Sequence, residues 1–190
     1  MLTKISDTIQ KCTLRDQGNV YFLDIEKKII IDTGNRTYRD DLKNFLGRAV
    51  NFEEIQIVIF THLHYDHSGN YDLFPNAEFY ASPEEIDDFR KNPEGSVLDP
   101  TVAEMLKSIT IKPLPQEFLG LKILKTPGHT RGSICLYYEN EKTLFSGDTI
   151  FQAKSQGRTD LPTSQPDQMR NSIMSLIEVP YKILCPGHDY

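Results

Sequence analysis

The chain has 190 residues, 38% of them hydrophobic and 25% charged, with a net charge of −6. This length and composition indicate a single domain, expected to span residues 1–190, with a sizeable core. The acidic balance and the lack of a basic run argue against nucleic-acid binding, and no apolar run is long enough to span a membrane. With no signal-like N-terminus and three widely spaced cysteines, we expect a cytoplasmic protein with reduced thiols.

The first predicted elements are a hairpin, a helix and a strand. Residues 20–25 and 29–34 are apolar runs on either side of a polar turn, the pattern of a β-hairpin. Apolar side chains then recur at helical spacing from Tyr38 to Ala49, which predicts an amphipathic helix. Residues 55–60 are apolar, β-branched at several positions and free of Gly and Pro, so they predict a buried strand.

The middle of the chain predicts a short strand at 77–80 and two helices. Ser82-Pro83-Glu84-Glu85 is typical of a helix start, with Ser82 as the cap and Glu85 reaching back to the cap residue. Asp99-Pro100 opens the next helix. Its predicted apolar face consists of Val102, Met105, Leu106 and Ile109.

The second half repeats the order of the first. Residues 134–138 and 143–146 predict another hairpin, and 181–185 another strand. Between them a helix is expected after Pro166. Its predicted apolar face consists of Met169, Ile173, Leu176 and Ile177. Two such units can pack sheet against sheet, with the helices outside and the loops meeting at a shared edge.

A histidine cluster directly follows the predicted strand 55–60. His62, His64, Asp66 and His67 lie within six residues of one another. If the extended geometry continues past the strand, the rings of His62 and His64 point to the same side. Imidazole and carboxylate are ligands of Zn, Fe and Mn, so this segment predicts a metal site.

The remaining histidines occur in a similar context. His129 and His188 each follow an apolar run and a Pro-Gly pair, and Asp148 ends another apolar run. We therefore expect all five histidines in loops at strand ends and none in a helix. With two aspartates they make seven candidate ligands, too many for one tetrahedral ion and suited to two ions.

This order of motifs resembles the metallo-β-lactamase superfamily and, within it, the short glyoxalase II-like hydrolases. The resemblance implies a four-layer αβ/βα sandwich of two pseudo-repeated halves. It also implies two divalent ions, Zn or alternatively Fe or Mn. One would be held by His62, His64 and His129 and the other by Asp66, His67 and His188. Asp148 would bridge the ions with a hydroxide that attacks a carbonyl, and Asp66 and Asp148 would be the catalytic residues.

Other residues are candidates for supporting roles. In the long loop 152–165, Lys154 or Arg158 could contact an anionic substrate group, and an ion pair with Asp160 that orders the loop is the alternative for Arg158. Tyr65 either faces the cleft or packs. Asp32 either orients a metal ligand or caps a tight turn.

The resemblance favours hydrolysis of small-molecule thioesters by a monomer or homodimer. Gly157-Arg158-Thr159-Asp160 also resembles a segment of persulfide dioxygenases, which implies an alternative reaction at one Fe held by the equivalents of His62, His129 and Asp148. Phe151 stands where quorum-signal lactonases carry Tyr, which disfavours a lactonase, and another kind of ester hydrolase is also a lesser alternative. Glyoxalase II has a further C-terminal helical domain, so we expect little dependence on glutathione.

Overall fold

The first of two β-sheets holds seven strands in the order β1-β2-β3-β4-β5-β6-β7. The computed structural model describes residues 1–15, 17–153 and 155–189. Strands β1 to β4 are antiparallel and β4 to β7 are parallel. The strands are β1 (Leu2–Lys4), β2 (Ile9–Cys12), β3 (Val20–Asp24), β4 (Lys28–Ile31), β5 (Ile57–Ile59), β6 (Glu78–Ala81) and β7 (Ile111–Pro113).

The second sheet has five strands in the order β12-β11-β10-β9-β8. It is antiparallel except for the pair formed by β11 and β12. Its strands are β8 (Glu117–Phe118), β9 (Leu121–Lys125), β10 (Ile134–Tyr138), β11 (Thr143–Gly147) and β12 (Ile183–Pro186).

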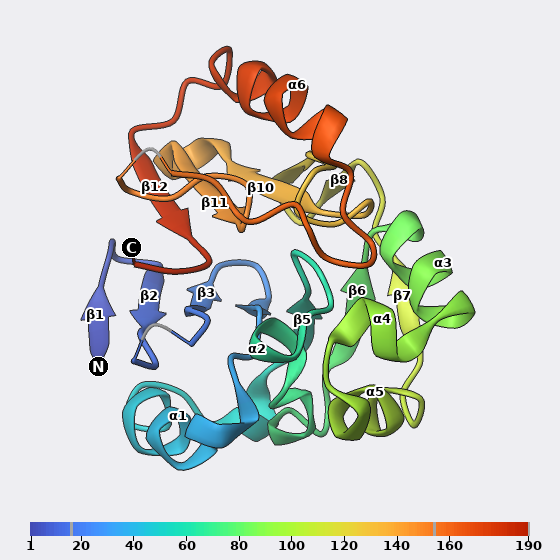
Figure 1. Cartoon of the computed structure of the whole chain (residues 1–190). Helices are drawn as coiled ribbons and strands as arrows, with labels where there is room; N and C mark the ends of the chain where they lie inside the picture. Colours follow the sequence, from blue (N-terminus) through green and yellow to red (C-terminus); the bar gives the residue numbers. More distant parts are fainter. Residues whose placement is uncertain (16, 154, 190) are drawn as a thin grey trace.

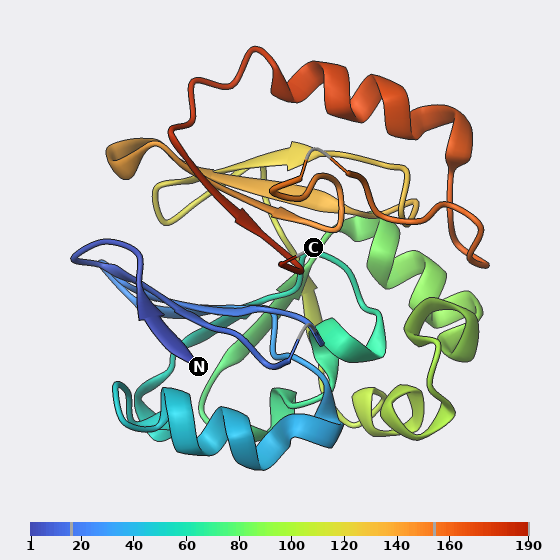
Figure 2. The same cartoon turned by 60° about the vertical axis from the view of Figure 1, so that its left-hand side comes forward.

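Helices cover the outer faces of both sheets, as Figures 1 and 2 show. Helix α6 lies over the second sheet, and the remaining helices lie against the first. The α-helices are α1 (Arg39–Leu46), α2 (Tyr65–Ser68), α3 (Pro83–Lys91), α4 (Pro93–Val97), α5 (Pro100–Leu106) and α6 (Pro166–Leu176). Within the described residues, no helix combines the length and apolar character needed to cross a membrane.

Alternation along the strands divides the core into layers. Ile29 and Ile31 of β4 point into the core between the sheets, whereas Ile30 packs in the core under α1 and α5. In β10, Leu136 points between the sheets and Cys135 packs with Leu176 of α6. Because successive strand residues face opposite sides, each sheet contributes to two cores, and the result is the predicted four-layer sandwich.

The predicted repeat is confirmed by the topology. In each half a hairpin leads through a helix to a strand that pairs in parallel with the second strand of the hairpin. Several details of the sequence prediction are wrong, among them the bounds of a strand and the burial of one side chain. The strand predicted at 55–60 covers only Ile57–Ile59, and Ile177 is 67% exposed rather than part of the buried face of α6.

Candidate metal centre

The histidine-rich segment lies at the end of β5, between the two sheets. His62 and His64 face the same space, with ring centroids 4.6 Å apart. His67 is the exception to the expectation that no histidine is helical, because it lies in the single turn of α2. That turn returns its side chain toward His62, and these two ring centroids are 4.1 Å apart.

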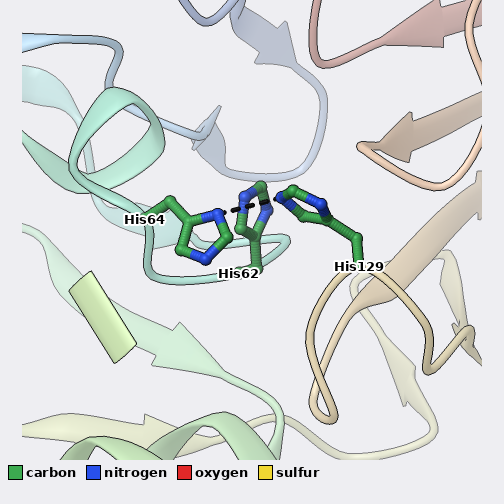
Figure 3. Close-up of side chains that lie close together, drawn as sticks. All are labelled: His62, His64 and His129. Atoms are coloured by element: carbon green, nitrogen blue, oxygen red, sulfur yellow. Dashed lines mark hydrogen bonds between the residues drawn. The ribbon is translucent and has the colours of Figure 1, made fainter. Parts of the chain in front are cut away.

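His129 completes the first group of donors from the opposite sheet. It follows β9 and points at the two histidines that follow β5 (Figure 3). Nδ1 of His64 and Nε2 of His129 are 2.9 Å apart. One ligand atom each from His62, His64 and His129 lies within 4.8 Å of the others, and all three residues are buried.

Asp66, His67 and His188 form a second group within the same distance limit of 4.8 Å. Nε2 of His67 and Nε2 of His188 are 3.3 Å apart. Asp148 lies between the groups. Its Oδ2 is 3.4 Å from Nε2 of His129 and 3.5 Å from Nε2 of His188, and its Oδ1 is 3.4 Å from Nε2 of His67.

Asp32 contacts the ring of His67 through Nδ1, the nitrogen that faces away from the other candidate ligands. Its Oδ2 is 2.9 Å from Nδ1 of His67, and the carboxylate also accepts hydrogen bonds from the backbone N–H and the hydroxyl of Thr61. In the neutral ring, donation from Nδ1–H leaves Nε2 with a lone pair that faces Asp148 and His188. Asp32 has the left-handed φ of 56°, a backbone conformation that Asp tolerates better than most residues.

The two histidines from the second sheet have different partners. Nδ1 of His129 lies 2.7 Å from the backbone oxygen of Arg158, so it donates there and leaves Nε2 for the donor group. At His188 the arrangement differs, because the backbone N–H of Gly18 donates to Nδ1 over 3.3 Å. Tyr21 fixes the backbone just before His188, because its hydroxyl donates to the backbone oxygen of Pro186 over 2.7 Å.

The electrostatics of the two groups differ. Burial lowers the pKa of His64 to about 3 and that of His62 well below its usual value, so the first group consists of neutral imidazoles. Burial alone would also lower the pKa of His67 and His188. The carboxylate of Asp148 and its acidic neighbours outweigh burial, raising the pKa of His188 to about 9 and that of His67 well above its usual value. The second group therefore favours positive charge.

The donor set fits two divalent cations. Nε2 of His62 is buried and has no hydrogen-bonding partner among the described residues, as expected of an atom that binds a metal. The positive charge that the second group favours would be supplied by a cation in place of protons. Burial would raise the pKa of Asp148, but His67 holds it well below its usual value. This carboxylate is therefore ionised and can act as a metal ligand.

A pocket of about 390 Å³ opens onto the donors. Five of the candidate ligands line it, together with Tyr65, Leu98, Phe151, Gln156, Gly157, Arg158 and Leu161. Arg158 forms a bidentate ion pair with Asp160, at 2.7 and 2.8 Å. The predicted long loop therefore does lie beside the donors, but Lys154 is outside the described residues.

The side chain of Glu85 does not have the capping role that the sequence predicted. Ser82 caps α3 as expected, accepting a hydrogen bond from the N–H of Glu85. The Glu85 side chain does not reach back to the cap residue. Its Oε1 accepts hydrogen bonds from the N–H of Leu63 and the hydroxyl of Thr130, which belong to two ligand-bearing loops. The local capping pattern gave no sign of these long-range contacts.

Comparison with known proteins assigns the family. The model of the metallo-beta-lactamase superfamily matches residues 13–188. The chain belongs to this superfamily. A probable metallo-hydrolase of Methanocaldococcus jannaschii is 35% identical over 183 residues, which cover 90% of this chain and 87% of that protein.

Two further similar proteins are informative. A hydroxyacylglutathione hydrolase of Francisella tularensis is 28% identical over 151 residues, covering 75% of this chain and 52% of that enzyme. A crystal structure of a protein in a di-iron-bound form superposes with a TM-score of 0.73 at 26% identity, covering 93% of this chain and 89% of the other. The superfamily thus accounts for both the sandwich and the His/Asp cluster.

Proposed function

We propose that this metallo-hydrolase is binuclear and hydrolyses thioesters of small molecules. The observation that carries the proposal is the position of Asp148, with one oxygen 3.4 Å from His129 of the first group and 3.5 Å from His188 of the second. A carboxylate between two donor sets suits a pair of ions that share a ligand. Zn is the proposed metal, with Fe or Mn as alternatives.

The chain's own residues would divide the work. Two divalent ions at these sites would supply a water of lowered pKa and polarise a carbonyl. The first group offers three neutral imidazoles. Asp66, whose side chain is 19% exposed, reaches the pocket and can accept a hydrogen bond from a water there. Asp148 is almost fully buried and holds the two groups at a fixed separation.

Two features support a thioester substrate. The hydroxyacylglutathione hydrolase relative is named for a reaction of this class, although the match spans about half of that enzyme. Tyr65, Leu98, Phe151 and Leu161 form an apolar part of the pocket wall beside the candidate ligands. Such a wall can hold the acyl or thiol arm while the carbonyl lies at the donors. Arg158 at the pocket could contact an anionic group, in exchange for its pairing with Asp160.

The alternative is a persulfide dioxygenase that uses one Fe. The observation in its favour is that His62 shares one candidate ligand group with His129 and another with Asp148, and that Oδ2 of Asp148 is 3.4 Å from Nε2 of His129. Iron itself does not separate the two functions, since a related structure is a di-iron form. The two functions differ in the number of ions per chain and in the reaction that is catalysed.

The test uses the whole chain purified without added metal. Elemental analysis should find two ions per chain after loading. A panel of acyl thioesters, including S-lactoylglutathione, should show turnover that is lost with a chelator and restored by metal. A glutathione persulfide assay should show no oxygen uptake. One ion per chain together with robust oxygen uptake would replace the hydrolase by the dioxygenase.

A further inference from the structure

Glu85 is a fully buried acid in the first turn of α3, with 0% of its surface exposed. Its Oε1 accepts a hydrogen bond from the hydroxyl of Thr130 over 2.8 Å and a longer one from the N–H of Leu63 over 3.4 Å. Leu63 lies between His62 and His64, and Thr130 directly follows His129. One oxygen therefore joins the two loops that provide the first group of donors.

Other contacts bring the same helix against the His129 loop. The hydroxyl of Ser82 donates to the backbone oxygen of Gly132 over 2.6 Å. Arg131 pairs with Asp88 on the second turn of α3, at 2.9 and 3.0 Å. The approach at Gly132 is so close that a Cβ there would lie 2.3 Å from the backbone nitrogen of Glu85. Helix α3 thus fixes a loop of the second sheet against the first.

Burial of Glu85 needs a reason beyond helix capping. Ser82 already caps the helix, so an apolar side chain at position 85 would satisfy the fold without desolvating a carboxyl group. The second oxygen, Oε2, has no hydrogen-bonding partner in the part of the chain that the structure describes. What the carboxyl group provides is an acceptor shared by two loops that come from different sheets.

We propose that Glu85 is a positioning residue for the first group of donors. It sets the separation between the His62–His64 segment and His129 through Leu63 and Thr130, and it does not contact the metal itself. The inference rests on the proposed metal-dependent function. A purely structural role would instead lower stability and leave the metal affinity of the folded protein unchanged.

The experiment compares Glu85→Ala, Glu85→Gln and Glu84→Gln with the wild type. Glu84 lies on the same turn, is partly exposed and pairs with Lys125, so its variant is the matched control. Each metal-free protein is titrated with Co²⁺ and followed by the visible absorption bands, and folding is checked by thermal melting. We expect Glu85→Ala to weaken the first equivalent about tenfold or more and to change its spectrum. Glu85→Gln keeps the acceptor oxygen and should remain close to the wild type, as should Glu84→Gln.

The outcomes are decisive in either direction. Equal affinity for the first Co²⁺ in folded Glu85→Ala and wild type would overturn the proposal, as would a loss in folded Glu85→Gln as large as in Glu85→Ala. If Glu85→Ala does not fold, Thr130→Val removes the donor of the shorter hydrogen bond at nearly constant volume. It should weaken the first equivalent several-fold, and no change would overturn the proposal. The readout is metal binding, so the absence of thioester turnover would refute the proposed function alone.

Discussion

Replacing Asp32 by Asn tests how the second group of donors is prepared for a metal. The Asp32 carboxylate accepts three hydrogen bonds, from the N–H of Thr61 (2.8 Å), the hydroxyl of Thr61 (2.7 Å) and Nδ1 of His67 (2.9 Å). Asn has the same shape and tolerates the left-handed backbone, so packing is preserved. One acceptor oxygen, however, becomes a donor.

Either orientation of the new amide disturbs this arrangement. If its oxygen faces the N–H of Thr61, its NH₂ group faces Nδ1 of His67 and favours the tautomer that carries the proton on Nε2. That nitrogen faces Asp148 and His188, so a metal could bind it only if the proton moved to Nδ1, where the amide NH₂ group offers no acceptor. In the opposite orientation the amide NH₂ group faces the N–H of Thr61, so two hydrogen-bond donors meet. Loss of such a partner typically weakens metal affinity 10–100-fold, or about 1.4–2.7 kcal/mol.

The assay is a competition titration of metal-free protein with Zn²⁺ and a chromophoric chelator. We expect Asp32→Asn to weaken one equivalent by that factor and to leave the other within about twofold of the wild type. Asp24→Asn is the control, because Asp24 is an exposed residue at the end of β3 in the same hairpin. Two unchanged affinities in folded Asp32→Asn would refute the reasoning.

Three further outcomes are expected. His67→Ala should reduce the metal content from two ions to one and thioester turnover at least tenfold, about 1.4 kcal/mol of barrier; oxygen uptake with glutathione persulfide that survives the change would favour the dioxygenase. Gly187→Ala would place a Cβ 2.1 Å from Oδ1 of Asp148, so elemental analysis should show metal loss, and full loading would contradict this. Burial raises the pKa of Glu85 to about 7 from 4.5, so the native state binds the extra proton and stability falls as pH rises between these values. Urea unfolding of metal-free protein should show a decrease of up to about 3 kcal/mol across that range relative to Glu85→Gln, and parallel pH profiles would contradict it.

The sequence predicted most of the sandwich because its strands carry local signals. Alternation in β4 and β10 and the polar turns of the two hairpins fix which residues face which layer. It also predicted which side chains gather, because loops that follow strands running in the same direction emerge at one edge of a sheet, as those after β9, β11 and β12 do. His67 was misplaced only in that its segment closes a helical turn.

What the sequence could not predict depends on contacts between distant residues. Glu85 fits a local capping pattern, so nothing near it indicated that its carboxyl group contacts Leu63 and Thr130. Strands β1 and β2 are short and partly exposed, and their apolar pattern is too brief to identify. Likewise, the hydrogen bond from the backbone N–H of Gly18 to Nδ1 of His188 joins residues 170 positions apart.

That last contact has a consequence for how the protein reaches its native state. His62, His64 and His129 of the first group lie within 67 positions of one another, so this part of the centre can form early. His188 is placed only when β12 docks beside Gly18 and Tyr21, which closes a loop of more than 160 residues. During refolding we therefore expect the first ion to bind before the second, and the delay between them to report the closure of that loop.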